Sequence, residues 1–306
     1  MVTICIACYN HEKFILKCLN SLKKQNYKKI QTIISDDFSS DKTVKIINKF
    51  IKANPKLKIK FYKQKKNLGI AKNINFLQNK VASQYVVFFS GDDYMFPTKI
   101  KKQLSALKNN PQSPFCYTNC YWVNSDNNKK LFSHFSFLRK SPKNFNQLLN
   151  DNTIPSPTIM FNKKFLPKKI YKEKYKYLCD YISIIDIWHK SKVAPIYIDE
   201  CLSAYLKHSN SIMAQKIINN ERLVFINDYK IKFKNDAIKI TKLNNFKKIY
   251  LFNKAYEKII INKIPLKELF FSIPYIFLSL KWVLRYILLV INIFYYPIFK
   301  KFYKNI

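Results

Sequence analysis

Tyr85-Val-Val-Phe-Phe-Ser-Gly-Asp-Asp93 is the stretch of sequence from which the fold can be predicted. Its five apolar or aromatic residues are typical of a buried strand, which runs directly into a serine, a glycine and two carboxylates. Adjacent acids at the end of a buried strand repel each other and lose hydration, so they usually persist because a cation lies against them. We therefore expect a divalent metal at Asp92-Asp93. A plain corner, in which one aspartate caps the helix after Pro97, is the alternative.

Strand and helix patterns alternate on both sides of this stretch. Strands are expected at residues 2–8, 30–35, 57–62, 85–89 and 115–123. Helical patterns lie between them, and Ser39-Ser40-Asp41 is a good capping cluster for one of these helices. Gly69 is expected to supply an unusual backbone conformation before one of them. Further along, residues 178–190 are expected to be helical, and residues 196–206 to form two short strands around Asp199-Glu200. Strands that alternate with helices of about 10–15 residues predict an α/β fold with a Rossmann-like, mostly parallel central sheet flanked by helices.

Acidic residues follow two of these strands. In parallel α/β sheets, ligands bind beyond the carboxyl ends of the strands. The pairs Asp36-Asp37 and Asp92-Asp93 both lie at such ends, and therefore at one edge of the sheet. Two acidic clusters at one edge indicate a binding site more strongly than either cluster alone.

The charge of the chain is strongly positive. A net charge of +37 over 306 residues would attract nucleic acid, anionic lipid or phosphorylated substrates. Gly91-Asp92-Asp93 also occurs in polymerase palms, but there a strand returns, whereas here Pro97 and a helical pattern follow. The basic residues are spread along the chain rather than clustered with aromatic residues, so no nucleic-acid partner is expected.

The seven cysteines are odd in number, and most lie within apolar runs. This pattern indicates reduced, buried thiols in a cytosolic protein. Cys5 and Cys8 have a metal-like spacing, but side chains at these positions of a strand point to opposite faces, so zinc is not expected. No secretory signal is visible before the first strand, which also favours a cytoplasmic location.

Residues 213–306 form a second region, predicted to be basic, helical and membrane-associating. Residues 269–299 are dense in apolar side chains, but Lys281 and Arg285 interrupt them on one helical face. This pattern favours a helix in the membrane interface, with basic edges on lipid phosphates. A buried helix pair and a true span are the alternatives. We expect residues 265–304 to hold the protein peripherally on the anionic inner face of the cell membrane.

Six short motifs occur in order along the chain. They are Ile6-Ala-Cys-Tyr-Asn10, the stretch 33–43, Asn67-Leu-Gly69 with Asn75, Phe89-Ser-Gly-Asp-Asp93, Cys179-Asp180 and the stretch 202–211. Over residues 1–212 their order and spacing resemble family 2 of the inverting glycosyltransferases, which have the GT-A fold. The resemblance implies a metal-dependent enzyme that moves a sugar from a nucleotide-sugar donor, with a UDP-sugar favoured, to a glycan or lipid-linked glycan acceptor.

The resemblance also implies a role for each matched residue. Nucleotide contacts are expected from Ala7, Tyr9, Asn10, Asp36, Asp37, Asn67, Gly69, Asn75 and His208. Donor-sugar contacts are expected from Gly91 and Asp93, and ligands for Mn²⁺ or Mg²⁺ from Asp92 and His208. Asp180 matches the general base, which takes the proton of the acceptor hydroxyl.

Several positions depart from the family pattern, among them Ser90, which stands at the first position of the family's Asp-x-Asp metal motif. Phe38 stands where a glycine is typical, Ile74 where an arginine is frequent, and Cys179 where a second acid usually precedes the base. Asp186 is therefore a rival for the role of base. The departures also leave open a non-catalytic, membrane-associated protein that keeps the fold.

Overall fold

The computed structural model describes residues 1–127, 129–136, 140–149, 153–208 and 218–247. The chain divides into two compact units, Met1–Glu221 and Arg222–Ile306. This division lies close to the boundary expected at residue 212, and a membrane role for the second region stays a prediction. The segments 265–304 and 269–299 lie outside the described residues.

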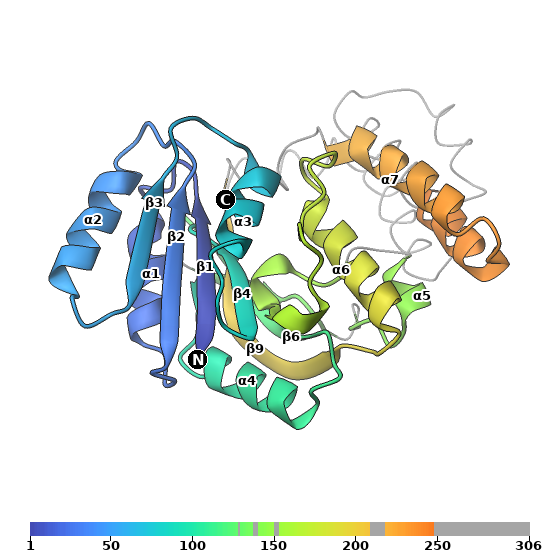
Figure 1. The fold of residues 1–306 in the computed structure, drawn as a ribbon, viewed down its shortest axis with the longest axis horizontal. Helices are drawn as coiled ribbons and strands as arrows, with labels where there is room; N and C mark the ends of the chain where they lie inside the picture. The colour runs from blue at the N-terminus through green and yellow to red at the C-terminus, as the bar shows by residue number, and fades with distance from the viewer. Residues whose placement is uncertain (128, 137–139, 150–152, 209–217, 248–306) are drawn as a thin grey trace, which may run out of the picture. The chain divides into compact units, whose positions relative to one another are not determined.

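The first half of the larger unit is a parallel sheet in the order β3-β2-β1-β4 (Figure 1). Its strands are β1 (Val2–Cys8), β2 (Ile30–Asp36), β3 (Ile59–Lys63) and β4 (Tyr85–Ser90). Its helices are α1 (Ile15–Lys23), α2 (Thr43–Ala53), α3 (Ile70–Gln78) and α4 (Lys99–Asn109). The alternation expected from the sequence is confirmed, because β1, β2 and β3 are each followed by a helix, and β4 is followed by a two-residue strand and then α4.

The second half of the sheet is mixed in direction. Its strands are β5 (Tyr94–Met95), β6 (Phe115–Asn124), β7 (Lys130–Ser133), β8 (Met160–Asn162) and β9 (Ile196–Lys207). The sheet order continues β8-β6-β9-β5, and β7 pairs with β6. The short β8 runs antiparallel between β4 and β6, so the expected parallel order holds in the first half of the α/β sheet, and the second half is mixed.

One expectation about this half was wrong. Two short strands were expected around Asp199-Glu200, but β9 is a single strand of 12 residues. Its pairing with β6 shifts register there, because Thr118 pairs with Ile198 and Asn119 with Cys201. The two acidic residues are accommodated as a bulge, which bends a strand without ending it.

The remaining elements surround the second half of the sheet. They are α5 (Phe145–Leu148), the 3₁₀ turns η1 (Ser156–Thr158) and η2 (Lys163–Phe165), and α6 (Cys179–Ser191). Helix α7 (Ile218–Lys232) begins at the end of the first unit, and residues 237–247 are again helical. The helix expected at 178–190 is therefore confirmed as α6, which carries Asp180 in its first turn.

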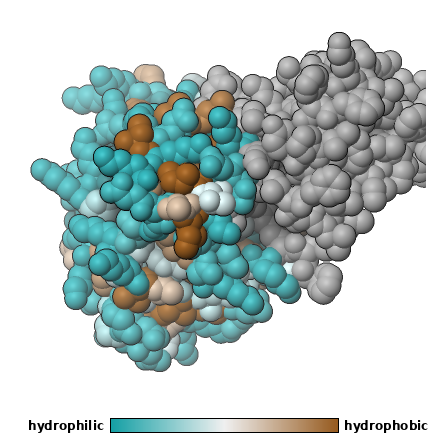
Figure 2. Space-filling view, turned by 90° about the vertical axis from the view of Figure 1, so that its right-hand side faces the viewer, coloured by the Kyte–Doolittle hydropathy of each residue, from teal (hydrophilic) through white to brown (hydrophobic). Residues whose placement is uncertain are grey.

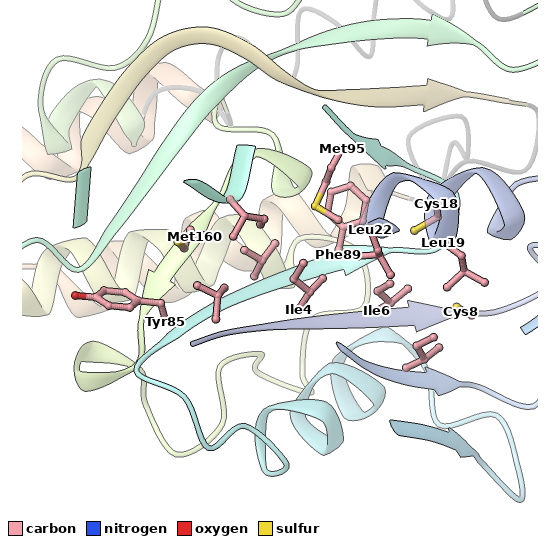
Figure 3. Close-up of a cluster of buried hydrophobic side chains, with 14 of the residues drawn as sticks. Ile4, Ile6, Cys8, Cys18, Leu19, Leu22, Tyr85, Phe89, Met95 and Met160 are labelled. Carbon is pink, nitrogen blue, oxygen red and sulfur yellow. The ribbon is translucent and has the colours of Figure 1, made fainter. Parts of the chain in front are cut away.

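The main core lies between β1, β4 and the helices on one face of the sheet. Figure 3 shows Ile4, Ile6 and Cys8 of β1 pointing toward Leu19 and Cys18 of α1. These side chains are fully or almost fully buried. Burial of a large aliphatic side chain such as Ile4, Ile6 or Leu19 stabilises the fold by about 1.5–3 kcal/mol. This packing fixes the carboxyl end of β1 beside α1.

Cys5 lies on the opposite face of β1, where its Sγ contacts the backbone oxygen of Leu77 in α3 at 3.9 Å. Cys5 and Cys8 therefore point to opposite faces, as expected. All seven cysteines are free thiols, and six of them are buried.

The surface is largely polar. Figure 2 shows one face of the molecule, on which hydrophilic residues predominate and hydrophobic residues form small, separate patches. Among the helices that the structure describes, none combines the length and the apolar character needed to cross a membrane.

Candidate functional site

The carboxyl ends of β1, β2 and β4 meet at one edge of the sheet. Cys8 is in register with Asp36, and Ala7 is in register with Ser90. The chain stays tied to this edge beyond β4, because the Gly91 N–H donates to the Ala7 oxygen at 2.9 Å. The acidic residues of both predicted clusters therefore follow neighbouring strand ends, as the sequence indicated.

The loops after β1 and β2 are linked by hydrogen bonds. The Asn10 N–H donates to Ser39 Oγ at 2.9 Å, and Asn10 Oδ1 accepts from the Ser40 N–H at 2.9 Å. The Glu12 N–H donates to Asp41 Oδ2 at 2.9 Å. Asn10 adopts a φ of 55°, a conformation that asparagine tolerates better than most residues. These bonds hold Asn10 and the exposed Tyr9 in a fixed arrangement beside Asp36.

Asp36 and Asp37 are both buried but have different partners. Asp36 accepts hydrogen bonds from the N–H and the hydroxyl of Ser39. Asp37 accepts from the N–H groups of Leu68 and Gly69 at 2.7 and 2.9 Å. Burial raises the pKa of Asp37, although these two backbone donors oppose the shift. Asp37 therefore anchors the loop after β3, whereas Asp36 lies with Ser39 beside the Asn10 loop.

Phe38 is strained and half-exposed. Its φ is 68°, and its side chain is 51% exposed despite being aromatic. A positive φ is uncommon for a bulky residue and costs on the order of 1–3 kcal/mol, so the surrounding turn must enforce it. This explains why glycine is typical at this position, and it places an exposed ring next to Asp36 and Asp37.

Gly69 ends the loop after β3 with a φ of 80°, so the unusual backbone conformation expected there is confirmed. Asn67 Oδ1 accepts from the Gly69 N–H at 3.0 Å. Asn75 is buried in α3, and both polar atoms of its side chain bond to the backbone of Tyr171, at 2.8 and 2.9 Å. Its contact with a nucleotide stays a prediction, because the structure uses its amide to attach residue 171 to α3.

Gly91 has no room for a side chain. A Cβ there would lie 2.8 Å from Cys8 Sγ and from His11 Nδ1, and 3.1 Å from Ile15 Cδ1. The glycine therefore allows the turn after β4 to press against the loop after β1. This close approach brings His11 toward the carboxylate of the next residue, Asp92.

Asp92 lies between two histidines. Its Oδ2 is 3.0 Å from His208 Nε2, and the His208 ring packs on Phe14 with the ring centroids 4.6 Å apart. Burial alone would raise the pKa of Asp92, but the His11 ring and hydrogen bonds from His208 and Ser90 lower it to about 2. Asp92 is therefore ionised at neutral pH, and the structure places it in contact with His208, whereas their predicted role as metal ligands stays a prediction.

His11 is a site residue that the sequence interpretation missed. Its only signal was its position directly after the Ile6–Asn10 motif. His11 Nδ1 and Asp92 Oδ1 are both buried, and neither has a hydrogen-bond partner among the described residues. Buried polar atoms are rarely left unpaired unless a ligand or ion completes their bonding. The unpaired Oδ1 of Asp92 therefore suits a divalent cation.

A cation here would also need ligands from outside the protein. Within the described part of the chain, no group of three or more His, Cys, Asp or Glu side chains is arranged to hold a metal ion by itself. Sites for Mg²⁺ and Mn²⁺ commonly use one or two carboxylates together with phosphate oxygens of the substrate. The residues present fit a metal that is bound jointly with a diphosphate.

Asp93 points into the protein rather than toward the sheet edge. Its side chain is buried, and its Oδ1 accepts from the Leu206 N–H of β9 at 2.9 Å. Burial, and then the neighbouring charge of Asp92, raise the pKa of Asp93 well above its ordinary value. The pKa values of Asp92 and Asp93 are therefore shifted in opposite directions, which limits the repulsion between these adjacent carboxyl groups. A donor-sugar contact from Asp93 stays a prediction.

Asp180 has the pKa expected of a base that works near neutral pH. Burial, and then the charge of Glu221, raise the pKa of Asp180 to about 6, although the Tyr181 N–H opposes the shift. The rival Asp186 is engaged elsewhere, in an ion pair with Lys172 at 2.6 Å. Cys179 is buried, so it does not replace the missing second acid at the surface.

Tyr205 connects the two acidic centres. The charges of Asp93, Asp92 and Asp180 all add to the effect of burial in raising its pKa. The Tyr205 hydroxyl therefore lies within electrostatic range of both the residue 92–93 turn and the first turn of α6. Tyr205 therefore feels the charge of both Asp92 and Asp180, although 87 residues separate these aspartates in sequence.

Comparison with known proteins gives the same fold. The solved structure of S. aureus TarS 1-349 in complex with UDP-GlcNAc matches with a TM-score of 0.58 and 17% identity, over 96% of this chain and 80% of that one. The mannosyltransferase of Pyrobaculum calidifontis, solved with GDP-Man and Mn2+, matches with a TM-score of 0.56 and 12% identity, over 96% of this chain and 87% of that one. The GT-A fold inferred from the motifs is confirmed.

Relatives by sequence carry the glycosyltransferase name. An uncharacterized glycosyltransferase of Haemophilus influenzae is 32% identical over 114 residues, which are 36% of this chain and 43% of that relative. The chain thus matches less than half of this relative's length. The model of the family described as "Glycosyl transferase family 2" matches residues 3–170, more than half of the 306 residues, and the chain belongs to that family.

Proposed function

We propose that this chain is a metal-dependent, inverting glycosyltransferase that uses Asp92 at the metal and Asp180 as base. The observation that carries the proposal is the opposite tuning of these two carboxylates. The pKa of Asp92 is lowered to about 2, and that of Asp180 is raised to about 6. Acidic groups whose environments drive their pKa values apart take different roles in a reaction.

The edge formed by β1 and β2 suits a nucleoside. Asn10 offers fixed polar groups there, Tyr9 and Phe38 offer exposed rings, and the buried carboxylate of Asp36 is held next to them by Ser39. A carboxylate is a natural acceptor for the N3–H of uracil, so Asp36 is the favoured contact with the base. A UDP-sugar donor is further supported by the structural neighbour that was solved with UDP-GlcNAc.

Asp92 and His208 would hold Mn²⁺ or Mg²⁺ together with oxygens of the donor diphosphate. When bound, such an ion stabilises the charge that develops on a departing nucleotide. Asp92 suits this position because it is ionised throughout the physiological pH range. The neighbour that was solved with Mn2+ supports a divalent cation here without deciding between the two metals.

Asp180 would take the proton of the acceptor hydroxyl as its oxygen attacks the anomeric carbon. Attack from the face opposite the leaving nucleotide inverts the configuration of that carbon. A base with a pKa near 6 is largely ionised at pH 7 and is still basic enough to accept a proton. The acceptor would be a glycan or a lipid-linked glycan.

A panel of nucleotide sugars with Mn²⁺ or Mg²⁺ tests the activity directly. We expect at least one donor, most readily a UDP-sugar, to release nucleotide in a metal-dependent reaction, even as slow hydrolysis without acceptor. The measurement is nucleotide release with and without EDTA. A chain that binds donors but releases no nucleotide under any condition would favour the non-catalytic alternative.

Membrane attachment is proposed separately, from the sequence of residues 265–304. A chain that ends before residue 265 should move from the membrane fraction to the soluble fraction. Full-length protein with Lys281→Glu and Arg285→Glu should lose binding to anionic vesicles while keeping the apolar residues. Flotation with vesicles of neutral and anionic lipid measures both effects. Equal partitioning of full-length and truncated chains would contradict this proposal.

A further inference from the structure

Glu221, in the first turn of α7, binds the backbone just ahead of the helix that carries Asp180. One oxygen of its carboxylate accepts from the Lys176 N–H. The other accepts from the N–H groups of Tyr177 and Leu178, each at 2.7 Å. Three consecutive backbone donors therefore converge on one carboxylate, which comes from more than 40 residues further along the chain.

These bonds lie just ahead of the first turn of α6, at its N-cap residue and the two residues before it. Leu178 is the N-cap residue of α6, and no side chain within the helix start caps it. Free N–H groups at the start of a helix attract a negative charge, and hydrogen bonds to a carboxylate are stronger than those to neutral acceptors. Glu221 therefore fixes the backbone at residues 176–178, only two residues before Asp180.

We propose that Glu221 is a positioning residue for the reaction, which holds the start of α6 so that the Asp180 carboxylate faces the acceptor hydroxyl. The inference rests on the proposed role of Asp180 as base. The family match ends at residue 170, so Glu221 comes from a part of the chain that lies beyond it. The start of α6 is thus held by a residue from the segment that follows the part of the chain matched by the family model.

The pH profile of activity tests this proposal, because a purely structural role of Glu221 would leave that profile unchanged. The charge of Glu221 adds to burial in raising the pKa of Asp180. The other ionisable groups that sense Asp180 are Tyr171, Cys179 and Tyr205, whose own pKa values are raised mainly by burial. Replacement of the Glu221 carboxylate by a neutral group should therefore lower the pKa of Asp180.

The experiment compares Glu221→Gln, Glu221→Ala and Asp180→Asn in the full-length chain, with nucleotide release as the assay. Gln keeps one oxygen acceptor but removes the charge, so the acid limb of kcat/KM should move to lower pH. Ala removes all three bonds, and kcat should fall about 10-fold to 10²-fold because displacement of a catalytic group by about 1 Å has effects of this size. The KM for the donor should change less than twofold in both variants.

Glu200→Gln is the matched control, since Glu200 is an exposed glutamate on β9 that pairs with Lys102 at the surface. It should leave the rate and the pH profile unchanged. A Glu221→Gln protein whose pH profile and kcat match the control would overturn the inference. So would loss of donor binding in parallel with activity, since that indicates general damage to the fold.

The Asp180→Asn protein separates this inference from the proposed function. If it is inactive while both Glu221 variants behave like the control, only the role of Glu221 is wrong. If it keeps full activity, the proposed base is wrong, and the inference about Glu221 is overturned with it. Should Glu221→Ala fail to fold, Glu221→Gln still decides the outcome.

Discussion

Asp92→Asn should reduce the kcat of sugar transfer roughly 10³-fold, because a metal held at the leaving diphosphate is worth several kcal/mol of transition-state stabilisation. Asparagine keeps the size of the side chain, and its oxygen can still accept from His208, whose Nε2 is 3.0 Å from the native carboxylate. The protein should therefore fold. Only the charge that holds the cation is lost, so titration calorimetry should detect no Mn²⁺ binding in the presence of nucleoside diphosphate.

The stability of this variant has a predictable sign. The folded-state pKa of Asp92 is about 2, below the ordinary 3.8, so its ionisation stabilises the fold above pH 4. This contribution disappears as the pH falls toward 2. At neutral pH, Asp92→Asn should lose up to about 2 kcal/mol of unfolding free energy.

Asp126→Asn is the control for Asp92→Asn, because Asp126 lies in an exposed turn. It removes one carboxylate without touching the sheet edge, and should change neither activity nor metal binding. Full activity of the Asp92→Asn protein would remove the basis of the metal assignment.

Asp180→Asn should lower kcat about 10²-fold to 10⁴-fold, which is the usual range for loss of a positioned general base. In the unmodified chain, kcat/KM should fall below about pH 6, because protonation of Asp180 removes the base. The acid limb should be absent from the residual activity of the variant. A pH series from 5 to 8 with a saturating donor would measure both effects.

The Asp180→Asn protein should be more stable than the unmodified chain, although its activity is lower. The folded-state pKa of Asp180 is about 6, above the ordinary 3.8, so its ionisation weakens the fold as the pH rises from about 4 to 6. Asparagine resembles the neutral acid, so Asp180→Asn should gain up to about 3 kcal/mol at pH 7. A protein that is more stable and less active fits a base held in an unfavourable environment. If the Asp180→Asn protein had unchanged activity, Asp186 would become the candidate for the general base.

Much of the first half of the fold followed from local patterns. The apolar runs of β1 and β4 and the helical spacing of Ile15 and Leu19 predict their elements directly, because burial on one face imposes its period on the sequence. β5 and β8 went unrecognised because strands of two and three residues leave no period to detect. Their pairing depends on distant partners, Ser203 for β5 and Phe115 for β8.

The candidate site was predictable to different degrees. Asp92 and His208 could be assigned to one site because motifs mark them, and the structure brings them into contact. His11 was missed since a histidine after a loop motif has no distinct spacing, and its role depends on the close approach that Gly91 permits. Glu221 was missed because its partners are backbone N–H groups, which every sequence offers equally.

The sequence by itself determined that Asp36-Asp37 and Asp92-Asp93 lie at one edge of the sheet, because the carboxyl ends of parallel strands share an edge. Only the tertiary structure decided which partners the two aspartates of a pair have. Asp92 meets His208 whereas Asp93 turns inward to Leu206. The direction of a side chain at a turn depends on which donors the rest of the chain brings within reach, and no local pattern encodes those donors.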